Sequence, residues 1–62
     1  MPFVHVRMIE GRTKEQKDRL VKAITRDVAE ICETKPEGVW VVIEDVPKIN
    51  WGVAGTLLAD RK

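Results

Sequence analysis

The chain has one cysteine and one histidine among its 62 residues, and this scarcity excludes two common ways of stabilising a small domain. Cys32 cannot form a disulfide within the chain, and Cys32 and His5 cannot supply a cysteine and histidine zinc site. A domain of this length buries only about 60% of the surface of its unfolded chain. Since 44% of the residues are hydrophobic, the sequence predicts that association of subunits supplies the missing stability.

An excess of one charge and a long apolar run are also missing. Eleven basic residues nearly balance ten acidic ones and are interspersed with them, so nothing indicates a nucleic-acid partner. No apolar stretch approaches the roughly 20 residues of a membrane span, and the start lacks the features of a secretory signal. Together with the unpaired cysteine, these absences favour a cytoplasmic protein. We expect one domain over residues 1–62, without repeats or linkers.

Residues 2–9 alternate in the manner of a β-strand. Val4, Val6 and Met8 lie on one face, and the other face is mixed: it holds Phe3, His5, Arg7 and Ile9. A histidine on such a face is more often packed or hydrogen-bonded than catalytic. We therefore give His5 a structural interpretation.

A helix and a second strand are predicted to follow. Thr13 and Gln16 have the spacing of a capping box, so a helix should begin there and continue to about Glu33. Cys32 lies on its apolar stripe, where we expect a buried packing residue. Pro36 ends the helix, and residues 39–44 then form a strand that is apolar on both faces, as in parallel sheets.

These elements predict an α+β fold, a β-α-β subunit with two parallel strands and a C-terminal hairpin at about residues 49–55. Two strands and one helix do not make a stable sheet alone. The simplest solution is that dimerisation completes a four-stranded sheet. The helices would then cover one face, and further subunits would cover the other.

Pro2 admits two interpretations. Proline directly after Met1 is compatible with nothing more than a processed start that fixes one φ angle ahead of a strand. If Met1 is removed, however, Pro2 carries a free secondary amine. An α-amino group has a pKa of about 7.7 to 8.0. Partial desolvation lowers that pKa toward neutrality, where general bases work best.

The chain resembles the small 4-oxalocrotonate tautomerases over essentially its whole length. The resemblance is carried by Pro2, by Ile9-Glu10-Gly11-Arg12 and the following Glu15-Gln16-Lys17, by the parallel second strand, and by Trp51-Gly52. It implies an isomerase that uses no cofactor or metal. It also implies a homohexamer built as a trimer of dimers, which converts a dienol such as 2-hydroxymuconate from aromatic degradation to the conjugated 2-oxo acid.

The resemblance also implies roles for individual residues. Pro2 would be the catalytic base. Arg12, from an adjacent subunit, would hold the far substrate carboxylate and draw electron density toward the carbon being protonated. Trp51 would exclude water from the Pro2 amine. Taken singly, Arg12 and Trp51 also fit a surface arginine and an interface aromatic.

Trp40 departs from the family pattern, because the best-known members carry a second arginine at this place. An indole offers one N–H donor and no positive charge. Trp40 would therefore pack between subunits or line a more apolar substrate pocket, suited to an aryl or monoacid enol. The residues that could supply the missing charge are Arg7, Lys48, Arg61 and Lys62.

Two further functions stay open from the sequence. One is hydration or dehalogenation of an unsaturated acid, with the Pro2 ammonium as an acid. The other is a non-catalytic oligomeric binding protein.

Overall fold

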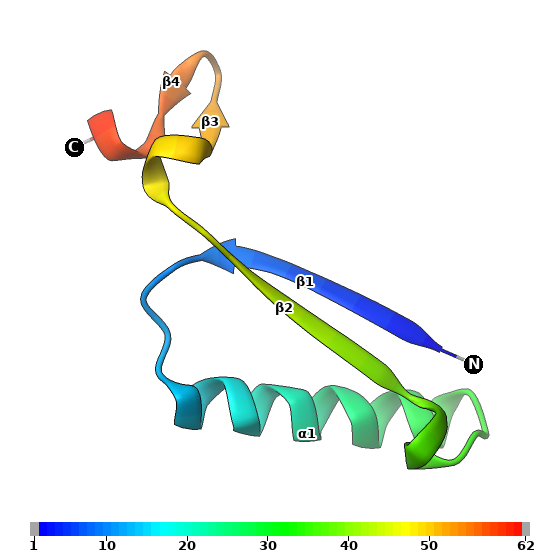
Figure 1. Ribbon diagram of the computed structural model, residues 1–62. Helices are drawn as coiled ribbons and strands as arrows, with labels where there is room; N and C mark the ends of the chain where they lie inside the picture. Colours follow the sequence, from blue (N-terminus) through cyan, green and yellow to red (C-terminus); the bar gives the residue numbers. More distant parts are fainter. Residues whose placement is uncertain (1, 62) are drawn as a thin grey trace.

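The computed structural model describes residues 2–61, and its main body is a β-α-β unit (Figure 1). Strand β1 (Phe3–Ile9) leads into helix α1 (Lys14–Ile31) and then into strand β2 (Trp40–Val46). The two strands are parallel, and their register pairs Phe3 with Trp40 and Ile9 with Val46. The predicted α+β fold is confirmed.

Helix α1 begins at the predicted capping box. Thr13 Oγ1 accepts a hydrogen bond from the Gln16 backbone N–H at 3.1 Å, and Gln16 Oε1 accepts one from the Thr13 N–H at 2.9 Å. One turn later, Lys22 Nζ lies 2.8 Å from Asp18 Oδ2. That hydrogen bond and the lysine charge lower the pKa of the Asp18 carboxyl group. The outer surface of the helix is thus solvated and carries exposed ion pairs.

The helix ends at Ile31, two residues before the predicted end. Glu33 adopts a left-handed φ of 52°, and the Thr34 N–H donates to the Ala29 carbonyl at 3.0 Å, as in a Schellman motif. Cys32 caps the helix and is exposed, so the prediction that it is buried is wrong for this chain. Ile31, the last residue of the helix, is also exposed, so the apolar stripe is open to solvent at this end in a single copy.

Strand β2 begins one residue later and extends two residues further than predicted. Its last residues are charged, but Asp45 forms an ion pair with Lys17 of α1, and the Val46 carbonyl accepts the Glu10 N–H at 3.1 Å. These contacts hold the end of β2 against both the helix and the end of β1. Contacts with α1 and with the end of β1 therefore determine where β2 ends.

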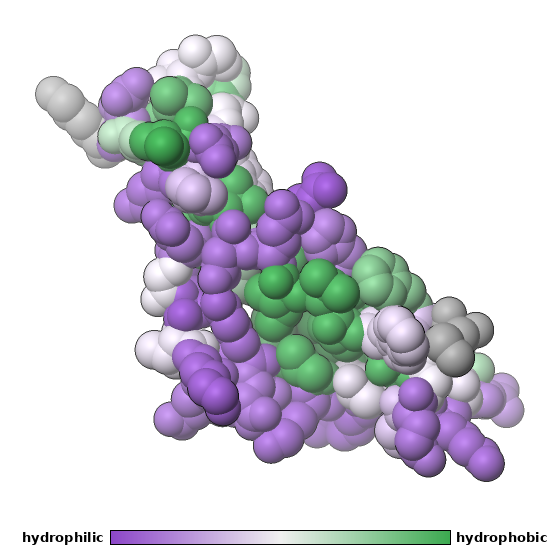
Figure 2. Space-filling model, in the orientation of Figure 1, coloured by the Kyte–Doolittle hydropathy of each residue, from purple (hydrophilic) through white to green (hydrophobic). Residues whose placement is uncertain are grey.

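The sheet has one face on the helix and one open face. Apolar side chains of the helix-facing side are half-buried: Val4, Val6, Met8, Val41 and Ile43. No side chain among residues 2–61 is fully buried. Figure 2 shows apolar atoms open to view in the region between the strands and the helix. A single copy therefore has no closed core, which supports the expectation that subunits associate.

The C-terminal segment projects away from the β-α-β unit (Figure 1). Strands β3 (Gly52–Val53) and β4 (Thr56–Leu57) form the predicted hairpin, and both turn residues, Ala54 and Gly55, have positive φ angles of 52° and 85°. This is the twist that a two-residue hairpin requires. Short 3₁₀ turns flank the hairpin at Lys48–Asn50 and Leu58–Asp60, and another, at Pro36–Gly38, precedes β2. No helix within residues 2–61 has the length and apolarity needed to cross a bilayer.

The end of α1 yields a stability prediction. A left-handed conformation costs a residue with a Cβ about 1–2 kcal/mol, a cost that glycine avoids. Glycine, however, loses roughly 0.5–1 kcal/mol more conformational entropy on folding, which offsets part of this gain. We expect Glu33→Gly to raise the free energy of unfolding by about 0.5–1 kcal/mol in urea titrations at fixed protein concentration. Glu33→Ala, which removes the charge but keeps the Cβ, should give no such gain. An equal gain in both variants would assign the effect to the carboxylate.

Candidate active site

Pro2 and Trp40 lie together at the end of the sheet where both strands begin. The Pro2 carbonyl accepts a hydrogen bond from the Trp40 backbone N–H at 3.0 Å. The next residue, Phe3, is the register partner of Trp40. Because the strands are parallel, the candidate base and the candidate binding residue share one end of the sheet.

Arg12 lies at the other end of the sheet, where the chain turns from β1 toward α1. Gly11 has a φ of 125°, a conformation that side chains with a Cβ rarely adopt. The turn places Arg12 directly before the N-cap residue Thr13, and its side chain is exposed. An exposed guanidinium in this place can form a bidentate pair with a carboxylate that is not part of its own chain.

Trp51 also lies beyond the carboxyl ends of the strands. It follows β2 after Pro47 and a 3₁₀ turn, and its carbonyl accepts the Leu58 N–H at 2.8 Å. Its half-buried side chain lines a cleft of about 540 Å³ with Arg7, Glu44 and Asn50. The cleft is therefore partly charged and has an aromatic wall.

The two groups of candidate residues are too far apart to form one site within a chain. The six steps from Phe3 to Ile9 span about 20 Å at the usual rise of a strand. Pro2 and Trp40 lie beside one end of this length, and Arg12 and Trp51 lie beyond the other. A site that contains all four of these residues must therefore combine residues from different copies of the chain.

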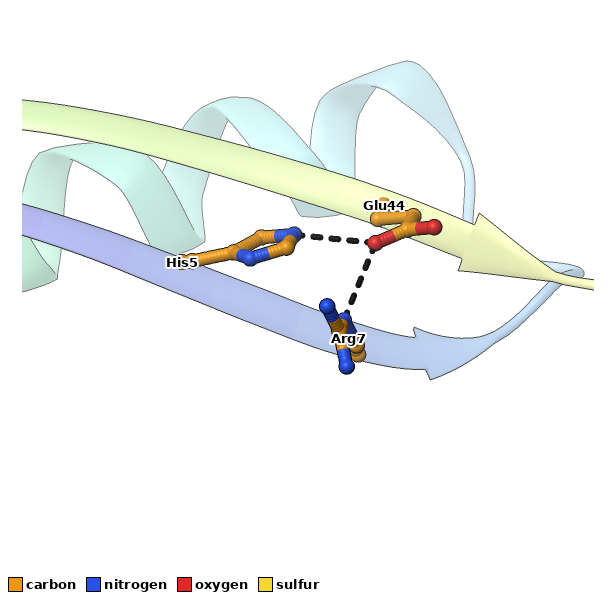
Figure 3. Close-up of polar contacts among 3 residues, drawn as sticks. All are labelled: His5, Arg7 and Glu44. Carbon is orange, nitrogen blue, oxygen red and sulfur yellow. Dashed lines mark hydrogen bonds and ion pairs between the residues drawn. The ribbon is translucent and has the colours of Figure 1, made fainter.

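A charged cluster that the sequence did not predict occupies the open face of the sheet (Figure 3). Glu44 Oε1 on β2 lies 3.0 Å from His5 Nε2 and 3.1 Å from Arg7 Nε, both on β1. Strand alternation places His5 and Arg7 on one face, but the sequence does not give the register that brings Glu44 to them. The structural interpretation of His5 agrees with this contact.

Of the four suggested sources of a second positive charge, the three within residues 2–61 do not lie beside Trp40 in the same chain. Arg7 contacts Glu44 and lines the Trp51 cleft. Lys48 begins one 3₁₀ turn of the C-terminal segment, and Arg61 caps the other. Lys62 lies outside the described residues. Trp40 is thus placed with Pro2 and Phe3 and not with a cation of its own strand pair.

Comparisons with known proteins agree with this geometry. A family model described as "Tautomerase enzyme" matches residues 2–61. A 2-hydroxymuconate tautomerase of Bacillus subtilis is 45% identical over 62 residues and covers 100% of both chains. A probable tautomerase of Halalkalibacterium halodurans is 44% identical over 61 residues, 98% of this chain and 100% of the relative.

Solved structures give the same result. The crystal structure of YwhB, described as a homologue of 4-oxalocrotonate tautomerase, superposes with a TM-score of 0.95 at 43% identity, covering 98% of this chain and 100% of its own. A heterohexameric 4-oxalocrotonate tautomerase of Chloroflexus aurantiacus gives a TM-score of 0.93 at 31% identity, with 100% of both chains covered.

A β-α-β chain with two parallel strands and a C-terminal hairpin has the subunit fold of these tautomerases. The chain belongs to the tautomerase family, and it is an isomerase.

The cluster around Glu44 gives a test of whether the open face is covered. If assembly buries this face, Glu44→Gln leaves Arg7 without its carboxylate and should lower the free energy of unfolding by about 3 kcal/mol. The matched control is Asp18→Asn on the exposed helix surface, which should cost much less, because water screens an exposed ion pair. Urea titrations at equal protein concentration measure both. Equal losses would mean that the open face stays in water.

Proposed function

We propose that the protein catalyses keto–enol isomerisation of a 2-hydroxydienoate such as 2-hydroxymuconate, with the Pro2 amine as general base after removal of Met1. The observation that carries the proposal is the placement of Pro2 and Arg12 at opposite ends of one parallel strand pair. Two copies whose strands run antiparallel would bring each Pro2 to the Arg12 and Trp51 end of the other. A symmetric pair would then contain two equivalent sites.

The chemistry needs one proton carrier and no external oxidant or reductant. The Pro2 amine takes the proton of the substrate's 2-hydroxyl group, and a carbonyl forms at that carbon as the double bonds shift. The Pro2 ammonium then returns a proton to the distant carbon of the dienol. The product is the conjugated 2-oxo acid, and the amine is neutral again.

Arg12 and Trp51 support this transfer in different ways. The Arg12 guanidinium of a neighbouring copy binds the far carboxylate and stabilises the negative charge that develops toward the protonated carbon. Trp51 covers the site with an apolar surface, which disfavours the charged form of the Pro2 amine and keeps it available as a base.

The assembly that fits these needs is a homohexamer, a trimer of dimers. The open face exposes Phe3, Trp40 and Val42, and the hairpin projects beyond its own unit. Joining two copies extends the sheet, and joining dimers covers the open faces. The heterohexameric relative from Chloroflexus aurantiacus, which has the same subunit fold, supports this assembly.

The role of Pro2 predicts a loss of activity when its amine is altered. On protein whose intact mass shows that Met1 is gone, Pro2→Ala should reduce the rate of 2-hydroxymuconate ketonisation by about 10²–10⁴-fold, the usual contribution of a positioned base. In the processed wild type, kcat/KM should fall as pH falls through the pKa of the Pro2 amine, because the protonated amine cannot accept a proton.

A sample that retains Met1 is the control, since its Pro2 nitrogen is an amide and cannot act as a base. Equal activity with and without Met1 would remove Pro2 from the mechanism. Activity that is lost instead as pH rises would indicate an ammonium acid, as in hydration or dehalogenation of an unsaturated acid.

A composite site also predicts complementation between two inactive variants. Pro2→Ala and Arg12→Ala homo-oligomers should each be impaired, the second by about 10–100-fold through loss of a charge-assisted hydrogen bond. Unfolding them together and refolding should restore part of the activity, because some sites then combine an intact Pro2 with an intact Arg12. Sedimentation should give a mass near six subunits before and after mixing. No recovery in a mixed hexamer would place both residues in the same copy.

A further inference from the structure

The surface beside Pro2 is apolar and aromatic. On the open face, Phe3, Trp40 and Val42 expose 60%, 58% and 44% of their surface. Phe3 and Trp40 are register partners, and Val42 follows on the same face of β2. These three side chains therefore form one continuous patch at the start of the strands, and Pro2 borders it through its hydrogen bond to the Trp40 backbone.

The positive charges of this face lie away from that patch. Arg7 is four residues beyond Phe3 on β1, or about 13 Å along the strand. Its Nε contacts Glu44 Oε1 at 3.1 Å, and the same oxygen lies 3.0 Å from His5 Nε2. Within its own chain, a substrate group next to Trp40 would therefore meet two aromatic rings and a single indole N–H donor. With the Arg12 of a neighbouring copy already bound to one carboxylate, a second carboxylate placed there would lose water without gaining a cation from this strand pair, which is costly.

We propose that Trp40 is a specificity-determining residue and that the favoured substrate is an enol acid with one carboxylate and an apolar, preferably aryl, group. This proposal rests on the proposed function, with Pro2 as base and the Arg12 of a neighbouring copy as carboxylate ligand. The substrate carboxylate binds Arg12, and its apolar group packs on Trp40 and Phe3.

The reaction stays balanced for such a substrate. Pro2 takes the proton of the enol hydroxyl, the C–O bond becomes a carbonyl, and the electron pair of the C=C bond takes a proton from the Pro2 ammonium at the neighbouring carbon. Each turnover isomerises one enol to one 2-oxo acid and restores the amine.

The first test compares two substrates on processed protein. Phenylenolpyruvate has one carboxylate and an aryl group, whereas 2-hydroxymuconate has two carboxylates. We expect the wild type to ketonise phenylenolpyruvate with at least tenfold higher kcat/KM. Trp40→Arg should reduce this ratio at least tenfold, chiefly through a lower KM for the diacid. Trp40→Phe, the matched control, keeps an aromatic surface and should keep the preference.

Several results would overturn this assignment. These are a wild type that prefers the diacid, a ratio that Trp40→Arg changes by less than twofold, and loss of the hexameric mass in Trp40→Arg and Trp40→Phe alike. The last result would make Trp40 a contact between subunits.

A second measurement needs no variant. Cinnamate and muconate are unreactive acids that differ in the same way as the two substrates, and both can be assayed as competitive inhibitors of the wild type. We expect cinnamate to bind at least tenfold more tightly. Equal or reversed inhibition constants would contradict the proposal.

Failure of the specificity assignment can be told apart from failure of the proposed function. If Pro2→Ala abolishes turnover of both substrates while the substrate ratio does not depend on Trp40, only the specificity assignment fails. If Pro2→Ala leaves both rates unchanged, the mechanism itself is wrong.

Discussion

The parallel pairing of β1 with β2 is the constraint on which the rest of the structure depends. Parallel strands start at the same end of a sheet, so the backbone hydrogen bond from Trp40 to Pro2 brings the amino terminus next to residue 40. The same pairing sends Arg12 and Trp51 to the opposite end, because each follows a strand. An antiparallel hairpin of the same length would have placed one member of each pair at each end. The length of β1 separates Pro2 from Arg12, and the direction of β2 places Trp51 at the Arg12 end. The proposed site therefore needs residues from more than one chain.

The lack of a closed core also indicates, on energetic grounds, that the protein needs more than one copy of the chain. Helix α1 covers one face of a two-stranded sheet, and no side chain within residues 2–61 becomes fully buried. The apolar surface left over, including Phe3 and Trp40, adjoins the proposed base. Contacts between copies would therefore both stabilise the fold and complete the chemistry. A variant that weakens association should impair activity even where it touches no substrate.

The sequence predicted the elements well because their signals are local. Strand alternation and the Thr13 and Gln16 capping box need only neighbouring residues, and both appear in the structure as predicted. The helix end was misplaced because Glu33, and not glycine, takes the left-handed position, so the usual stop signal is missing. The end of β2 was missed because Asp45 and Val46 are held by Lys17 and Glu10, which are far away in the sequence.

The candidate site was predictable only in part. Pro2, Arg12 and Trp51 were identified by resemblance, since each residue alone has an ordinary structural explanation. Glu44 was not identified, because its contact with His5 and Arg7 depends on the register between strands, which residue patterns do not specify when both faces of a strand are apolar.

At Trp40, the backbone and the side chain affect the surroundings of Pro2 in different ways. Its backbone N–H binds the Pro2 carbonyl whatever side chain the residue carries, so the placement of the proposed base depends on the strand and not on the indole. The side chain, in contrast, projects from the open face beside Phe3 and contributes an apolar surface next to the proposed base. If Pro2 is the proton carrier, a change at this position would alter which substrate group is accepted while Pro2 stays in place. On this argument, divergence of substrate preference within the fold requires no new backbone geometry.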